Sequence, residues 1–180
     1  MPGGWFLDPE LAGGGAVMDH TVHVADALRW MLGTEAKNVY AEIGTFFGAE
    51  GIDDGAILTL ELEGGAMADG AFATIDPSWS RGEGYPTWGD VTLRITGTSG
   101  VLNVDAFAQR LTSFDHEAGK AAWTYTGEDM NLLMLEGFLR GVTEGSPAGA
   151  SGVDGLRALE IVLAAYRSAE DNEPKAVERT

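Results

Sequence analysis

Residues 56–63, AILTLELE, alternate between two kinds of position along their whole length. One set of alternate positions is fully apolar: Ala56, Leu58, Leu60 and Leu62. The other set is mixed: Ile57, Thr59, Glu61 and Glu63. Successive side chains of a strand point to opposite faces of a sheet, so this stretch predicts a β-strand with one apolar face. Strands of this kind are typical of antiparallel sheets that pack one face on a core.

The same period of two extends outward from Lys37 to about Thr126. Stretches that alternate or nearly alternate, separated by glycine-containing turns, are VYAEIGTFF (39–47), AFATI (71–75), DVTLRITGTSGVLNVDAF (90–107), RLTSFD (110–115) and AAWTYTG (121–127). We expect the helix-covered face of the sheet to carry Leu58, Leu60, Leu62, Val91, Leu93 and Ile95. The opposite face is expected to carry Tyr40, Phe46, Ile57, Thr59, Glu61, Phe72, Thr74, Thr92, Arg94 and Thr96.

Helical periodicity flanks the strands on both sides. Residues 16–32 place apolar side chains at helical spacing, and Gly33 follows as a C-terminal glycine. Two further stripes are Leu132, Leu135, Leu139 and Val142, and then Leu156, Leu159, Leu163 and Tyr166. Ser151 and Asp154 form a capping box before the last helix. One helix, a run of strands and two helices predict an α+β fold: an open, mostly antiparallel sheet with helices on one face and the other face free for oligomerisation.

Length and composition limit the classes of protein. At 180 residues we expect one domain, 1–180. The formal net charge of −17, with 11 Lys and Arg, argues against nucleic-acid and anionic-membrane partners. No apolar run reaches the length of a membrane span, and the start has no signal-peptide pattern. The sequence has no cysteine, which excludes disulfides and cysteine nucleophiles and favours a cytoplasmic location.

The stretch GGGAVMDHTVHVAD, residues 13–26, is the candidate catalytic segment. Asp19 and His23 are four residues apart and share one side of the expected helix with Asp26, whereas His20 is expected to point elsewhere. A histidine flanked by carboxylates suits general acid–base chemistry. Gly14 and Gly15 would let a ligand approach the helix N-terminus. An Asp–His pair at this spacing is also typical of a plain surface ion pair.

A second candidate segment is SWSRGEGYPTWGD, residues 78–90, which interrupts the strands. Trp79, Arg81 and Tyr85 combine aromatic faces with a cation, which suits a sugar-like ligand. The alternative is a hairpin tip that packs its own aromatic side chains. We expect no metal site, and no glycine-rich strand-to-helix turn is present to hold a dinucleotide.

Three stretches together resemble a known family. WFLDPELAGGGAVMDHTVHVADALRWMLG, WGDVTLRITGTSGVLNVD and GVDGLRALEIVLAAYRSAE are similar to successive parts of the C-terminal domain of the glucose–fructose oxidoreductase/inositol dehydrogenase (Gfo/Idh/MocA) family. The resemblance implies an NAD(P)-dependent oxidoreductase acting on a sugar, polyol or related hydroxy compound. It implies that His23 assists proton transfer, that Asp19 orients it or binds a substrate hydroxyl, and that Asp26 is structural.

Family members also carry an N-terminal Rossmann domain and a Glu-Lys-Pro motif with a catalytic lysine, and neither is in this sequence. We therefore expect the substrate-binding and oligomerisation half of such an enzyme, inactive alone. On this hypothesis the chain binds no cofactor, and NAD or NADP serves the complete enzyme. The alternative hypothesis is a free-standing, non-catalytic binding or assembly module with the same fold. The apolar, threonine-rich sheet face predicts a homodimer or higher assembly, and the resemblance points the same way. The alternative is a solvated face that uses threonine only for its β-propensity.

Overall fold

The computed structural model describes residues 3–65, 70–82, 84–87, 89–146 and 149–180. The chain divides into two compact units: Met1–Glu83 with Ala150–Thr180, and Gly84–Gly149. The expected single domain thus consists of two structural units, and each is described separately below.

The first unit is a four-stranded antiparallel sheet with helices. Its elements in chain order are the 3-10 helix η1 (Gly4–Leu7), α1 (Pro9–Ala12), α2 (Ala16–Leu32), β1 (Glu35–Gly44), β2 (Gly55–Glu63), β3 (Ala71–Ile75), α4 (Gly152–Asp171) and β8 (Lys175–Ala176). The strand order is β3-β2-β1-β8, so the short strand after the last helix returns to pair with β1.

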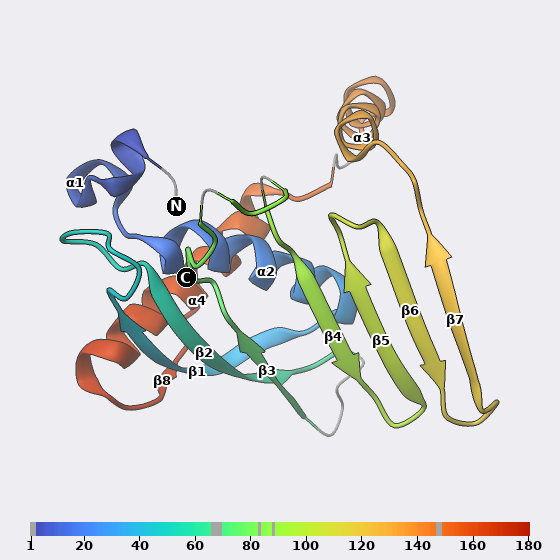
Figure 1. The fold of residues 1–180 in the computed structure, drawn as a ribbon, viewed down its shortest axis with the longest axis horizontal. Helices are drawn as coiled ribbons and strands as arrows, with labels where there is room; N and C mark the ends of the chain where they lie inside the picture. Colours follow the sequence, from blue (N-terminus) through green and yellow to red (C-terminus); the bar gives the residue numbers. More distant parts are fainter. Residues whose placement is uncertain (1–2, 66–69, 83, 88, 147–148) are drawn as a thin grey trace. The chain divides into compact units, whose positions relative to one another are not determined.

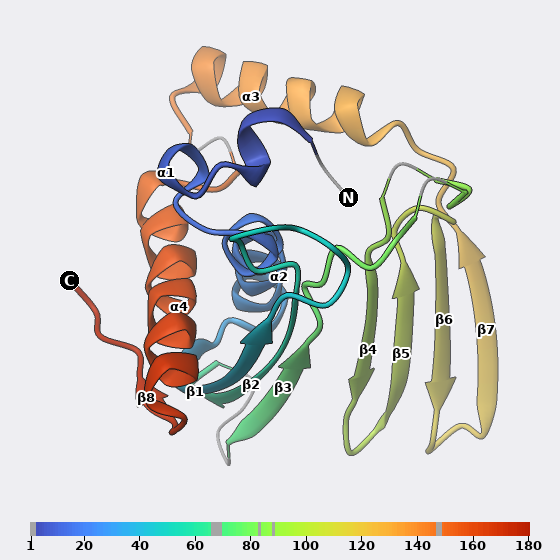
Figure 2. The ribbon, with the colours of Figure 1, turned by 60° about the vertical axis from the view of Figure 1, so that its left-hand side comes forward.

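Helices α2 and α4 lie on one face of this sheet (Figures 1 and 2). Leu58, Leu60 and Leu62 of β2 point to that face and are at most 4% exposed. On the opposite face Ile57 is 50% exposed and Phe72 of β3 is 80% exposed. The alternation in residues 56–63 therefore predicted the two faces of this sheet correctly, because each strand buries every second residue.

The ends of both helices agree with their sequence signals. α2 ends at Leu32, and Gly33 follows with φ of 60°, the left-handed conformation that favours glycine. Ser151 and Asp154 form the predicted capping box of α4. The predicted stripe of α4 is wrong at two of its four positions: Leu159 and Tyr166 are half-buried, whereas Leu156 and Leu163 are 39% and 45% exposed.

The buried stripe of α4 consists mainly of smaller side chains. These residues are Ala158, Glu160, Ile161, Val162, Ala164, Ala165 and Ser168. The helix packs on both α2 and β1. Small side chains allow a helix to approach two neighbours closely, and this requirement selected the face that is buried.

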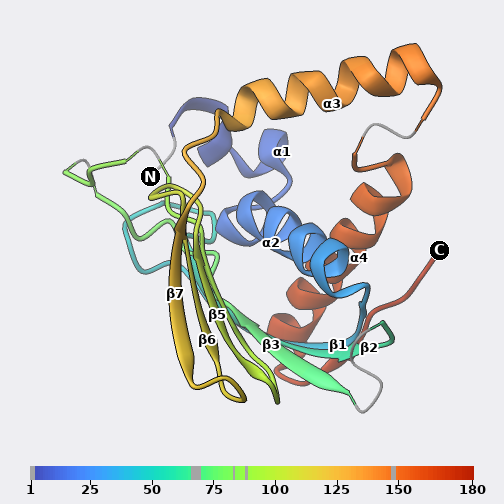
Figure 3. The same cartoon turned by 90° about the vertical axis from the view of Figure 1, so that its right-hand side faces the viewer.

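The second unit contains a second antiparallel sheet and one helix. Its elements are β4 (Thr92–Thr96), β5 (Gly100–Asp105), β6 (Arg110–Asp115), β7 (Lys120–Tyr125) and α3 (Met130–Glu144). The strands form a simple meander in the order β4-β5-β6-β7 (Figure 1), and Figure 3 shows the same sheet from its β7 side. The α+β class and the antiparallel arrangement are confirmed, but the strands form two sheets where the sequence suggested one.

The second unit is much less buried than the sequence suggested. Leu93 and Ile95 are half-buried, and Val91 lies before β4 and is 50% exposed. In α3, Leu132, Leu135, Leu139 and Val142 are each 54–65% exposed. Their periodicity correctly predicted a helix, but α3 packs against none of the four strands of its unit. Among the described residues, no helix is both long and apolar enough to cross a bilayer.

Candidate active site

The N-terminus of α2 is closed by Asp53, a residue from the turn before β2. The Asp53 carboxylate accepts the backbone N–H of Gly15 through Oδ1 at 2.8 Å and that of Val17 through Oδ2 at 2.9 Å. Its backbone carbonyl accepts the N–H of Ala16 at 2.9 Å. A carboxylate in this position satisfies N–H groups that a helix leaves without partners and favours the positive end of its dipole. The anion expected at this helix end is therefore a side chain of the protein itself.

Gly14 and Gly15 are needed for this internal contact. A Cβ atom on Gly15 would lie 1.8 Å from the carbonyl oxygen of Asp53. One on Gly14 would lie 2.4 Å from the hydroxyl oxygen of Tyr166 in α4. Asp53 and Tyr166 fill the space into which a side chain at these positions would point, and substrate contact by Gly14 and Gly15 remains a prediction.

Tyr166 of α4 also binds the Asp53 carboxylate. Its hydroxyl donates to Asp53 Oδ1 at 2.9 Å. Burial of the phenol, together with the neighbouring Asp53 charge and this hydrogen bond, raises the pKa of Tyr166 well above its ordinary value. The phenol therefore remains a neutral donor, and it links α4 to the first turn of α2.

Asp19 lies in the first turns of α2, but its carboxylate does not bond to His23. Oδ2 accepts a hydrogen bond from the ring N–H of Trp79 at 3.1 Å and lies 3.3 Å from His20 Nε2. His20 was expected to point elsewhere, and the structure corrects this. Neighbouring residues on a helix lie about 100° apart, and the imidazole reaches back to the carboxylate.

His23 lies one turn beyond Asp19 on α2, and its side chain is exposed. In the described part of the chain it takes part in no hydrogen bond and no ion pair. Its ring nitrogens are thus open to solvent or a ligand. The shared helix and the spacing of the predicted pair are present, but a direct bond between the two side chains is not.

Asp26, the third polar residue of the motif, faces a different partner. Its Oδ1 lies 3.6 Å from Nη1 of Arg29. Arg29 also binds both carboxylate oxygens of Glu35 at 2.9 Å and lies 3.3 Å from Asp154 Oδ1. Hydrogen bonding to Glu35 raises the pKa of Arg29, and the same contact lowers the pKa of Glu35. This network ties α2, β1 and α4 together, so Asp26 has a structural environment.

The second candidate segment is divided by the structure. Trp79 is 4% exposed and packs in a small core with Ala16, Ala49 and Ile52, so it meets the site through its N–H edge and not as an open aromatic face. Arg81 and Tyr85 are exposed, and Tyr85 belongs to the second unit. Glu83 and Trp88 lie outside the described residues. Ligand binding by Arg81 and Tyr85 remains a prediction.

Four residues around Asp19 were missed by the sequence reasoning: His20, Asp53, Asp54 and Tyr166. The Asp53-Asp54-Gly55 turn was a usable signal, since paired carboxylates just before a buried strand are unusual. Asp54 is fully buried and accepts the backbone N–H groups of Phe46, Phe47 and Ala49. Among the described residues, no group of three or more acidic or histidine side chains could hold a metal ion.

Known proteins match most of this chain. A family model described as the GFO/IDH/MocA C-terminal domain matches residues 1–103. The chain is 28% identical over 175 residues to myo-inositol 2-dehydrogenase of Thermotoga maritima, covering 92% of this chain and 50% of that protein. It is 31% identical over 160 residues to the rhizopine catabolism protein MocA of Rhizobium meliloti, covering 85% and 43% respectively. The chain thus spans about half the length of these relatives.

Solved structures share the fold. A levoglucosan dehydrogenase in complex with NADH and levoglucosan superposes with a TM-score of 0.83 at 20% identity, over 98% of this chain and 54% of that one. An oxidoreductase structure from Thermotoga maritima gives a TM-score of 0.81 at 23% identity, over 98% of this chain and 51% of that one.

Proposed function

Because this chain belongs to the GFO/IDH/MocA family, through the C-terminal domain of that family, we propose that it is the substrate-binding and oligomerisation half of an NAD(P)-dependent oxidoreductase. The proposed substrate is a sugar, a polyol or a related hydroxy compound. The observation that supports the proposal is α2 itself, which carries Asp19 and the exposed His23 four residues apart, in the stretch that resembles the family's motif.

The proposed roles follow from the surroundings of the two side chains. His23 is open on its ring nitrogens, so it can accept the proton of a substrate hydroxyl as that carbon is oxidised. Asp19 has one oxygen engaged by the ring N–H of Trp79, with His20 Nε2 beside it, and the other oxygen without a hydrogen bond among the described residues, so it can hold a substrate hydroxyl beside His23. Arg81, in the same unit, is proposed to contact the rest of the substrate, and ligand binding by Tyr85 is proposed for the second unit separately.

The start of α2 does not fit the pyrophosphate of a dinucleotide. A dinucleotide pyrophosphate binds free N–H groups at a glycine-rich helix start, and the corresponding groups of Gly15 and Val17 are bonded to Asp53. We therefore assign the hydride acceptor, NAD or NADP, to a nucleotide domain outside this chain, and we derive no cofactor step from the residues of this chain.

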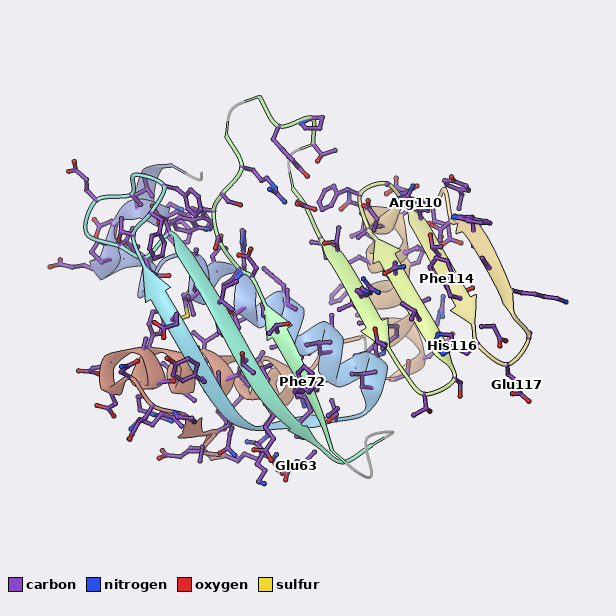
Figure 4. All side chains as sticks on the ribbon, turned by 60° about the horizontal axis from the view of Figure 1, so that its bottom comes forward. Glu63, Phe72, Arg110, Phe114, His116 and Glu117 are labelled. Atoms are coloured by element: carbon purple, nitrogen blue, oxygen red, sulfur yellow. The ribbon has the colours of Figure 1, made fainter. Side chains whose placement is uncertain are left out.

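The open sheet faces are proposed to form a homodimer. In the first unit, exposed Ile57 and Phe72 lie on the face opposite the helices. Figure 4 shows Phe72 on the first sheet and Arg110 and Phe114 on the second. Glu61 on this face is neutralised by Lys37 at 3.0 Å. Exposed apolar area of this kind marks an association surface. We also propose a cytoplasmic location, because a sequence without cysteine has no disulfide that requires an oxidising compartment.

A reconstitution experiment tests the proposed function. The chain, alone and together with the nucleotide domain of a relative, is given NAD⁺ or NADP⁺ and a panel of sugars and polyols, and reduced nicotinamide is followed by absorbance. Turnover is expected only when both parts are present. Sugar binding by the chain without turnover in any combination would instead support the free-standing, non-catalytic module.

A further inference from the structure

The contacts of the Asp19 carboxylate among the described residues are made by one oxygen, Oδ2. Trp79 Nε1–H donates to Oδ2 at 3.1 Å, and His20 Nε2 lies 3.3 Å from the same atom. In the described part of the chain, Oδ1 takes no hydrogen bond. The side chain of Asp19 is 26% exposed, so its second oxygen is within reach of a ligand.

His20 is fixed at its other nitrogen as well. Nδ1 lies 2.8 Å from the carbonyl oxygen of Pro77, a buried residue. A carbonyl oxygen only accepts, so Nδ1 carries the hydrogen. The imidazole also meets the Trp79 ring edge-on, with centroids 6.5 Å apart and planes at 81°. When Nε2 also carries hydrogen, the ring bridges the Pro77 carbonyl and the Asp19 carboxylate.

The adjacent residues Asp53 and Asp54 hold both partners of the Trp79–Asp19 hydrogen bond in place. Asp53 fixes the first turn of α2, as described above. The backbone carbonyl of Asp54 accepts the N–H of Trp79 at 2.8 Å. One dipeptide thus anchors both the helix that carries Asp19 and the segment that carries its donors.

We propose that His20 and Trp79 are positioning residues that orient Asp19 toward the substrate. Trp79 holds Oδ2 through its ring N–H, and His20 holds the same atom when its Nε2 carries hydrogen, which leaves Oδ1 directed to a substrate hydroxyl. This proposal rests on the substrate-binding role of Asp19 in the proposed function. It replaces a direct aromatic contact between Trp79 and the substrate with an indirect effect exerted through the carboxylate.

Removal of the donors to Asp19 Oδ2 should affect the kinetics differently from removal of His23. A carboxylate that binds a hydroxyl equally in the ground state and the transition state contributes to KM, whereas a proton acceptor contributes to kcat. Loss of a hydrogen bond to a charged group changes binding roughly tenfold or more. Trp79→Phe keeps the buried ring and removes only the donor.

The first test uses the complete chain alone, by NMR. The Trp79 indole N–H signal, assigned from its loss in Trp79→Phe, is expected to move upfield in Asp19→Asn. Asp26→Asn, on the same helix but bonded to Arg29, is the control and should leave the signal in place. An unmoved indole signal would overturn the proposal.

The second test measures kinetics in the reconstituted enzyme. Trp79→Phe and His20→Ala should each raise KM about tenfold with little change in kcat, while Trp5→Phe, an exposed tryptophan, should change neither. Unchanged KM with intact folding by circular dichroism would reject the positioning role. If the unaltered chain gives no turnover with any substrate, the proposed function fails, and the role of these residues toward substrate fails with it. The NMR experiment still decides whether Trp79 donates a hydrogen bond to Asp19.

Discussion

Asp53 caps the helix that contains the candidate site by accepting the N–H of Gly15, although the two residues are 38 positions apart in the sequence. Most N-caps are supplied by the residue immediately before the helix. Here the glycine at that position makes room for the cap of a distant turn, so the start of α2 depends on the tertiary fold.

Replacing Gly15 by alanine should destabilise the first unit strongly. A Cβ atom would meet the backbone carbonyl of Asp53, which cannot move without disturbing β2. Overpacking of this kind costs about 1–3 kcal/mol and more where the obstacle is backbone. Urea unfolding measures the loss, and Gly82→Ala, where a Cβ meets nothing within 4 Å, is the matched control. Equal stability of the two variants would contradict the prediction.

The buried carboxylate of Asp54 should make stability depend on acid. Burial by itself would raise the pKa of Asp54, but the N–H groups of Phe46, Ala49 and Phe47 outweigh it and lower the pKa below the ordinary 3.8. A lowered pKa stabilises the folded state above pH 3.8, and this contribution is lost as pH falls through the folded value.

Asp54→Asn is therefore expected to lower the free energy of unfolding by about 2–4 kcal/mol at pH 7. The difference in the free energy of unfolding between the unaltered chain and the variant should become smaller below pH 3.8. Thermal unfolding across pH 2.5–7 checks both statements, and a gap that stays constant with pH would count against them.

His23→Ala should lower kcat of the reconstituted enzyme by roughly a hundredfold or more, as loss of a general acid–base group does. Because the side chain is exposed, the fold should be unaffected. His116→Ala, in the turn after β6, serves as the control. Unchanged turnover would assign His23 to the surface.

The chain alone should bind neither NAD nor NADP with useful affinity. The start of α2 is closed by Asp53, and no other glycine-rich strand-to-helix turn occurs in the sequence. Isothermal titration calorimetry is the measurement. Micromolar binding of either nucleotide would reject both this prediction and the proposal that the cofactor belongs to another domain.

A homodimer through the open sheet faces should be present at tens of micromolar, burying on the order of 800 Å² or more per partner. Sedimentation velocity should show the dimer for the unaltered chain and a monomer for Thr59→Lys combined with Thr92→Glu. Both threonines are exposed, so the variant should fold. A monomeric unaltered chain, or a double variant that still dimerises, would reject the interface.

Local patterns in the sequence determined much of the fold. The alternation in residues 56–63 predicted both faces of β2, and the apolar period with Gly33 predicted α2 from Ala16 to Leu32. These features depend on neighbouring residues and on the 2.0 and 3.6 periods of the backbone, which a sequence displays directly. The Asp19–His23 spacing was visible for the same reason.

The tertiary structure alone decided what surrounds those side chains. The choice of the alanine-rich face of α4, the capping of Gly15 by Asp53 and the bond from Trp79 to Asp19 each join residues far apart in the chain. Periodicity identifies an apolar face but carries no information on which distant group will fill the space beside it. Packing and the pairing of buried polar groups settle that question, because both depend on atoms that meet only after the chain has folded.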